Sequence, residues 1–148
     1  MTTTTRSNDR RRRERGSAAI EAVIVVPAFM LFVLLIIAGG RLAIAHQQVE
    51  SAAAEAARSA SIARSPGQAA ADARAGADRS LQSNGLVCTS TEVQVKTAGF
   101  TAPVGTATQV SATVRCTVAL ADLGVPGLPG SHTVAASVSS PVDTYRER

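Results

Sequence analysis

The sequence has few of the side chains from which deep pockets and catalytic centres are built. Tryptophan is absent, and the chain contains one tyrosine, three phenylalanines, two histidines and two cysteines. Two of the phenylalanines, Phe29 and Phe32, lie in a single apolar run, so the remainder has little bulky material to line a cavity. This composition disfavours proteins that enclose a small-molecule substrate.

Recognisable catalytic and metal-binding motifs are also lacking. Neither His46 nor His132 has the carboxylate and nucleophile neighbours of a catalytic triad. The sequence holds no phosphate-binding loop, dinucleotide fingerprint or H-E-x-x-H motif. We therefore predict a non-enzymatic protein with no cofactor, no metal site and no small-molecule substrate.

What the sequence does contain is one long uncharged stretch. Residues 22–40 (AVIVVPAFMLFVLLIIAGG) carry no charge, and as a helix they would be about 28 Å long. That length matches the roughly 30 Å hydrocarbon core of a bilayer. A buried helix of a soluble core is the alternative, but such a helix normally has a polar face, which this stretch lacks. Pro27 lies inside the run, where it removes a backbone hydrogen bond and is expected to kink the helix.

Positive charge is distributed unevenly about this stretch. Six arginines precede it within residues 6–15, whereas only Arg41 follows closely. The positive-inside rule then places the N-terminus in the cytoplasm and the C-terminal region outside. An arginine cluster beside a membrane segment is explained by its role in setting the orientation of the helix and by attraction to anionic lipid. Nucleic acid is therefore not expected as a partner.

The junction between the basic leader and the apolar run has a specific composition. It reads Gly16-Ser17-Ala18-Ala19-Ile20-Glu21, so a glycine ends the leader and one carboxylate lies at the inner edge of the uncharged helix. An ionisable side chain near the membrane interior is costly, and it therefore points to a function.

The stretch from residue 15 to residue 64 resembles the TadE-like pilus-assembly proteins, and its start resembles the type IV prepilin signal. Beyond the junction, the likeness is carried by Pro27, Gly39-Gly40-Arg41 and the alanine-rich segment Val49–Arg58. The resemblance implies that a membrane aspartyl peptidase, the prepilin peptidase, cuts the Gly16–Ser17 bond. It also implies other pilin-like subunits and an inner-membrane assembly platform as partners, and a structural role as a minor pilin or pseudopilin.

Glu21 would then be the fifth residue of the mature chain. Its carboxylate could pair with the α-ammonium of Ser17 in a neighbouring subunit, since two charges that are each costly in lipid neutralise one another. Such a pair would set the register between subunits. The alternative is that Glu21 only extends its carboxylate to the lipid headgroups and that Gly16 is a linker residue.

Two other classes of protein stay open at this point. Ala43-Ile44-Ala45 fits a secretory cleavage site before His46, which would release a soluble protein. Against this, the apolar run is longer than that of a usual signal peptide, and Arg41 would lie in the cleavage region. The other class is an unprocessed, membrane-anchored binding module without a filament role.

Beyond the apolar run the pattern is that of two alanine-rich helices. Residues 42–63 contain neither Pro nor Gly, and apolar side chains recur at helical spacing. This stripe is either a packing face, for partner subunits or for the chain's own β region, or a plain stalk of high helix propensity. Ser65 as N-cap, Pro66 and Gln68 predict the start of a second helix, and Asn84-Gly85 predicts its end.

After Gly85 the period of the pattern changes from 3.6 to 2. Alternation over Glu92–Lys96, Val110–Val118 and, less cleanly, Thr133–Val142 predicts three short antiparallel strands with one face against the helices. Loops are expected over 99–105 and 122–130. The predicted fold is α+β: a long transmembrane helix that continues outside the membrane, a second helix and a small sheet of about three strands, which is a pilin-like arrangement.

The two cysteines suit a structural disulfide. Cys116 falls on the inward face of the clearest strand and Cys88 just before the first strand, and an even number of cysteines is typical of exported disulfide-bonded proteins. A bridge would close a loop of about 29 residues, which the chain-entropy model values at roughly 3.6 kcal/mol. Two buried free thiols are the alternative.

These signals divide the chain into four parts. We expect a basic cytoplasmic leader at 1–16 that is removed, a transmembrane helix at 17–45, extracytoplasmic helices at 46–84 and a β-rich head at 85–148. The protein is expected in the cell membrane, in contact with lipid and with its C-terminus outside the cytoplasm.

Overall fold

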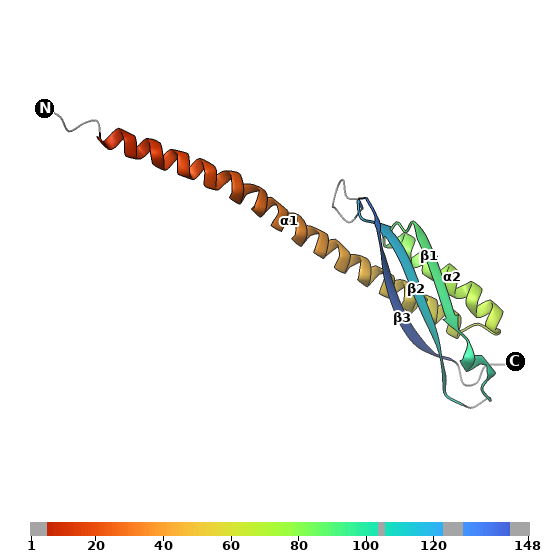
Figure 1. Cartoon of the computed structure of the whole chain (residues 1–148). Helices are drawn as coiled ribbons and strands as arrows, with labels where there is room; N and C mark the ends of the chain where they lie inside the picture. The colour runs from red at the N-terminus through yellow and green to blue at the C-terminus, as the bar shows by residue number, and fades with distance from the viewer. Residues whose placement is uncertain (1–5, 104–105, 123–128, 143–148) are drawn as a thin grey trace. The chain divides into compact units, whose positions relative to one another are not determined.

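The computed structural model describes residues 6–103, 106–122 and 129–142, and for residues 6–20 and 22 it describes the backbone alone. Its elements in chain order are α1 (Arg6–Ser61), α2 (Pro66–Ser83), β1 (Ser90–Lys96), the 3₁₀ turn η1 (Ala98–Thr101), β2 (Thr108–Ala119) and β3 (Ser131–Val142) (Figure 1). The α+β class is therefore confirmed. The chain divides into two units, one ending at Ala38 and one beginning at Gly39.

The described residues of the first unit all belong to α1. This helix begins at Arg6, so the basic leader is helical up to the apolar run, in keeping with the high helix propensity of arginine. It also passes through Pro27 without interruption. The exposed large apolar side chains of this unit, from Val23 to Ile37, range from 42% exposed at Leu34 to 73% at Val23. The predicted kink at Pro27 stays a prediction.

The second unit contains a three-stranded antiparallel sheet in the order β1-β2-β3. β2 and β3 pair along all twelve residues of each strand, from Thr108 opposite Val142 to Ala119 opposite Ser131. The three predicted strands are therefore confirmed, and each begins two residues before its predicted start. Polar residues at the strand ends carry no alternating apolar pattern, yet their backbones continue the ladder of hydrogen bonds. Parts of both predicted loops, residues 104–105 and 123–128, lie outside the described chain.

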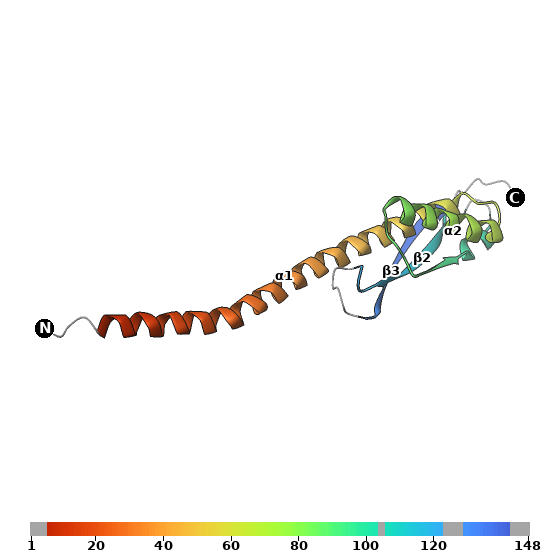
Figure 2. The same ribbon diagram turned by 90° about the horizontal axis from the view of Figure 1, so that it is seen from above.

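The core of the second unit lies between the sheet and both helices, which cover the same face of the sheet (Figure 2). The helical stripe predicted for residues 42–63 forms the helix side of this core. Its fully or almost fully buried members in α1 are Ala45, Val49, Ala52, Ala53, Ala56, Ala57 and Ala60. Since these side chains are covered by the chain's own head, the stripe is the packing face for the β region and is not free for another subunit.

Helix α2 begins and ends as its local sequence predicts. The hydroxyl of Ser65 accepts a hydrogen bond from the backbone N–H of Gln68, at 3.2 Å. At the other end Gly85 has a φ of +71°, a conformation that glycine adopts without a steric penalty. The backbone N–H groups of Gly85 and Leu86 then donate to the carbonyls of Gln82 and Leu81, each at 3.0 Å. This pair of bonds is a Schellman cap, and it directs the chain from α2 into the sheet.

Candidate functional site

The two residues of the predicted processing site lie inside α1. Gly16 and Ser17 belong to the helix that starts at Arg6, ten residues before Gly16. Peptide groups within a helix are engaged in hydrogen bonds, so a peptidase would have to unwind this end of α1 locally. Glycine lowers the cost of unwinding, because it is less favourable in a helix than alanine by about 1 kcal/mol. Cleavage here stays a prediction.

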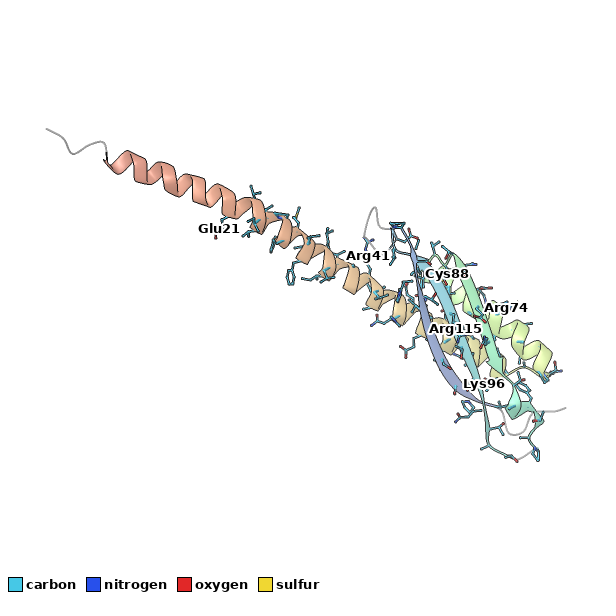
Figure 3. The ribbon with its side chains drawn as sticks, viewed as in Figure 1. Glu21, Arg41, Arg74, Cys88, Lys96 and Arg115 are labelled. Carbon is cyan, nitrogen blue, oxygen red and sulfur yellow. A yellow bond between two sulfur atoms is a disulfide. The ribbon has the colours of Figure 1, made fainter. Side chains whose placement is uncertain are left out.

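Glu21 lies on α1 at the start of the exposed apolar segment (Figure 3). Its carboxylate is exposed, and the apolar side chains that follow are exposed as well, with Val23 at 73% and Ile24 at 67%. Among the side chains that the structure describes, the ion pair is Arg115–Glu92, at 3.6 Å, and Glu21 has no such partner. Glu21 is therefore an acidic group at the edge of an apolar surface without a partner in the described part of its own chain.

The apolar surface that follows Glu21 is long enough to cross a membrane. The apolar stretch of this helix carries no charged residue between positions 22 and 40, and the segment most able to cross a membrane is not buried within the chain. In water so large an exposed apolar surface would be unfavourable, and it requires cover from lipid or from other apolar helices. The helical backbone satisfies its own hydrogen bonds, which is the condition for crossing the hydrocarbon layer.

The cysteines form the disulfide Cys88–Cys116, with their Cα atoms 5.4 Å apart. This confirms the expected bridge over the alternative of two free thiols. Cys116 is fully buried on the inward face of β2, whereas Cys88 is half-buried in the connection between α2 and β1. The bridge therefore fixes the end of that connection to the central strand of the sheet.

Two side chains of α1 make long-range hydrogen bonds that sequence reasoning missed. Arg41 donates from Nη1 to the backbone carbonyl of Asp122, at 3.1 Å, and Gln48 donates from Nε2 to the carbonyl of Asn84, at 2.9 Å. The first bond attaches α1 to the turn after β2, and the second attaches it to the end of α2. No local pattern could have revealed the first, since Arg41 and Asp122 are 81 residues apart.

A resident metal site has no support among the described residues, where no group of three or more His, Cys, Asp or Glu side chains comes together. The structure therefore presents an apolar membrane-length helix with one carboxylate at its edge, joined to a small disulfide-bonded α+β unit. The absence of enzymatic activity stays a prediction.

The family model described as TadE-like protein matches residues 16–58. This match confirms the TadE-like resemblance of the N-terminal segment, and it indicates a protein associated with a Tad pilus. It extends from Gly16, through Glu21 and the apolar run, to Arg58 in the half of α1 that packs against the sheet. No curated protein and no solved structure matches the chain.

Proposed function

We propose that this chain is a minor pilin or pseudopilin of a Tad-type pilus or a related secretion system, with a structural role in assembly. The observation that carries the proposal is the family match, which begins at Gly16 and spans the apolar run. In this proposal α1 is anchored in the cell membrane with its basic end in the cytoplasm, as the asymmetry of arginines favours. The prepilin peptidase cuts the Gly16–Ser17 bond, and the head lies outside.

The assembly step depends on Glu21. A carboxylate at the centre of a membrane helix costs roughly 2.5–3.5 kcal/mol on insertion scales, and less near the edge. Cleavage would place the α-ammonium of Ser17 at the same edge of the membrane. Pairing of Glu21 with the Ser17 ammonium of a neighbouring subunit would offset the cost of both charges and fix how far one helix is shifted along the other. The lack of a described partner for Glu21 within its own chain supports this arrangement.

The division of α1 into two surfaces supports lateral packing through its first half. Most large apolar side chains from Val23 to Ile37 are exposed, whereas one stripe of the second half is buried in the chain's own core: Ala45, Ala52, Ala53, Ala56, Ala57 and Ala60. Contacts with other pilin-like subunits and with the inner-membrane platform are therefore assigned to the first half. The head would be presented to the exterior by the second half.

The mass of the protein isolated from its native host tests the processing step. Removal of residues 1–16 is expected, with Ser17 as the new N-terminus. Retention of residues 1–16 would contradict the pilin proposal and favour a membrane-anchored binding module. A chain that begins at His46 would instead identify a secreted protein.

The charge pair has a separate test that uses the single lysine of the chain. Lys96 is exposed at the end of β1, so a Lys96→Arg variant leaves the α-amine as the primary amine available to a zero-length carbodiimide. We expect cross-linked dimers in which the peptide starting at Ser17 is joined to Glu21. Glu21→Gln should abolish this product, whereas Glu50→Gln, at an exposed position further along α1, should not. Equal cross-linking in both variants would contradict the pairing.

A further inference from the structure

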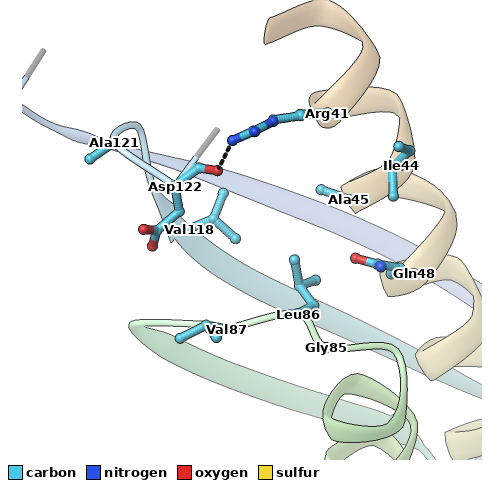
Figure 4. A pocket seen from close by; sticks show the side chains of 10 residues that line it. All are labelled: Arg41, Ile44, Ala45, Gln48, Gly85, Leu86, Val87, Val118, Ala121 and Asp122. Atoms are coloured by element: carbon cyan, nitrogen blue, oxygen red, sulfur yellow. Dashed lines mark hydrogen bonds between the residues drawn. The ribbon is translucent and has the colours of Figure 1, made fainter. Parts of the chain in front are cut away.

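An open cleft lies in the second unit, between α1, the connection from α2 to β1, and the end of β2 (Figure 4). Its volume is about 580 Å³. The residues that matter for its chemistry are Arg41 and Ile44 on α1, Leu86 and Val87 on the connection, and Ala121 and Asp122 after β2. The cleft is thus lined mainly by apolar side chains, and its charged groups are the guanidinium of Arg41 and the carboxylate of Asp122.

Two large apolar side chains of this cleft remain in contact with solvent. Ile44 is 54% exposed and Val87 is 71% exposed, although they line the same cleft as the core residue Val118, which is 1% exposed. The guanidinium of Arg41 donates one hydrogen bond, from Nη1, to the backbone carbonyl of Asp122. A guanidinium carries five N–H donors in total. It can therefore hold that bond and still donate to a phosphate group. A cation beside exposed apolar side chains is the composition of a membrane–water interface.

Two residues that line this cleft, Arg41 and Ile44, follow the apolar run directly in the sequence. Arg41, Ile44 and Gln48 are separated by three and four residues, so they share one side of the helix. Ile44 comes four residues after Gly40, which is about 6 Å of helix rise. A bilayer extends roughly 5–7 Å beyond its hydrocarbon core on each side. If residues 22–40 fill the core, Arg41 and Ile44 fall within the headgroup layer.

We propose that this cleft is a docking site for the outer leaflet of the membrane. The phosphate of a phospholipid binds Arg41, and Ile44 and Val87 enter the boundary between headgroups and acyl chains. The inference rests on the membrane-anchored part of the proposed function, but it requires neither cleavage at Gly16 nor a filament. A second copy of the chain is a poorer occupant, because a stable protein interface buries about 800 Å² on each partner and two exposed apolar side chains supply far less.

The absence of tryptophan from the chain gives this proposal a direct test. Val87→Trp introduces a single fluorescent reporter at the cleft, and Ile62→Trp provides a matched control at a 79% exposed position. Ile62 directly follows α1, whose last residue, Ser61, lies 17 residues beyond Ile44, roughly 25 Å of helix rise. Each full-length variant is incorporated at low density into vesicles of phosphatidylcholine and phosphatidylglycerol, with and without lipids brominated along their acyl chains.

We expect the emission of Val87→Trp to shift to shorter wavelength and to be quenched by brominated lipid at least about twofold more strongly than that of Ile62→Trp. Adding Arg41→Gln to Val87→Trp should weaken the quenching, whereas adding Arg58→Gln should not. Emission of Val87→Trp that is as water-like and as poorly quenched as that of Ile62→Trp would overturn the proposal. So would a shift that rises with protein density but shows no bromine quenching, since that result assigns the cleft to a second chain.

The outcomes separate this inference from the proposed function. Positive quenching in a protein that retains residues 1–16 would support lipid docking and contradict the pilin assignment. Loss of quenching in a protein that is cut after Gly16 would contradict lipid docking and support the pilin assignment.

Discussion

A Cβ atom on Gly76 of α2 would lie 2.7 Å from Oγ of Ser59 on α1 and 3.2 Å from the backbone carbonyl oxygen of Glu55. Gly76 itself is buried. The two helices are therefore in direct contact at this point, and the contact depends on the missing side chain. A glycine that would ordinarily weaken the middle of a helix here permits the approach.

Gly76→Ala should destabilise the head by about 1 kcal/mol. Alanine normally stabilises a helix interior by up to about 1 kcal/mol relative to glycine, but here the new methyl group meets a backbone oxygen that cannot rotate away. Gly67→Ala, in the same helix with no atom near its Cβ position, should be neutral or slightly stabilising. Urea unfolding of the detergent-solubilised chain, followed by circular dichroism, measures both. A stabilised Gly76→Ala variant would show that α1 and α2 can separate without cost.

Replacement of both cysteines by alanine should lower the free energy of unfolding by roughly 3.6 kcal/mol. The bridge spans a sequence separation of 28, and loop closure in the unfolded chain accounts for that amount in the chain-entropy model. The wild-type chain should lose a comparable amount in reductant, and the Cys88→Ala/Cys116→Ala variant should not respond to reductant. A loss below about 1 kcal/mol would mean that the helices and sheet hold the head together without the bridge.

The buried alanine stripe predicts opposite results at two adjacent positions of α1. Ala53 is 0% exposed in the core, whereas Ala54 is exposed. Ala53→Leu should destabilise the head by about 1–3 kcal/mol, because the added carbon atoms have no space between α1 and the sheet. Ala54→Leu should change stability by less than about 0.5 kcal/mol. Equal effects at both sites in thermal unfolding would contradict the assignment of the stripe to the core.

Ser65→Ala should cost about 1 kcal/mol of stability by removing the N-cap of α2. The hydroxyl of Ser65 accepts the N–H of Gln68, a donor that has no partner within the helix. Ser83 provides the control at the other end of α2, where its hydroxyl donates to the carbonyl of Ser80. Ser83→Ala should change stability by less than about 0.5 kcal/mol in the same unfolding measurement.

Local chemistry made some elements of this fold predictable. The second helix could be predicted because Ser65, Pro66 and Asn84-Gly85 are start and stop signals that act within a few residues. The disulfide followed from the position of Cys116 on the inward side of an alternating strand. The bounds of the strands were less predictable, since backbone pairing at the ends of β2 and β3 depends on the partner strand and not on side-chain type.

Contacts between distant parts of the chain were not predictable. Phe100 lies in a stretch expected to be a loop, yet the structure forms η1 there and buries the ring to 8% exposure. The bond from Arg41 to Asp122 joins two segments that neither periodicity nor spacing relates to each other. The processing site and the role of Glu21 were proposed from the N-terminal pattern, and both need the experiments on the native protein.

The position of the disulfide has a consequence for proteolysis of the second unit. Cys88 precedes β1 and Cys116 lies in β2, so the connection that contains Pro103 is enclosed in a covalent ring. A single nick near Pro103 would leave both fragments attached to one another. Such a chain would migrate as one band on a non-reducing gel and as two after reduction, and β2 and β3 would stay attached to the rest of the chain through the bridge.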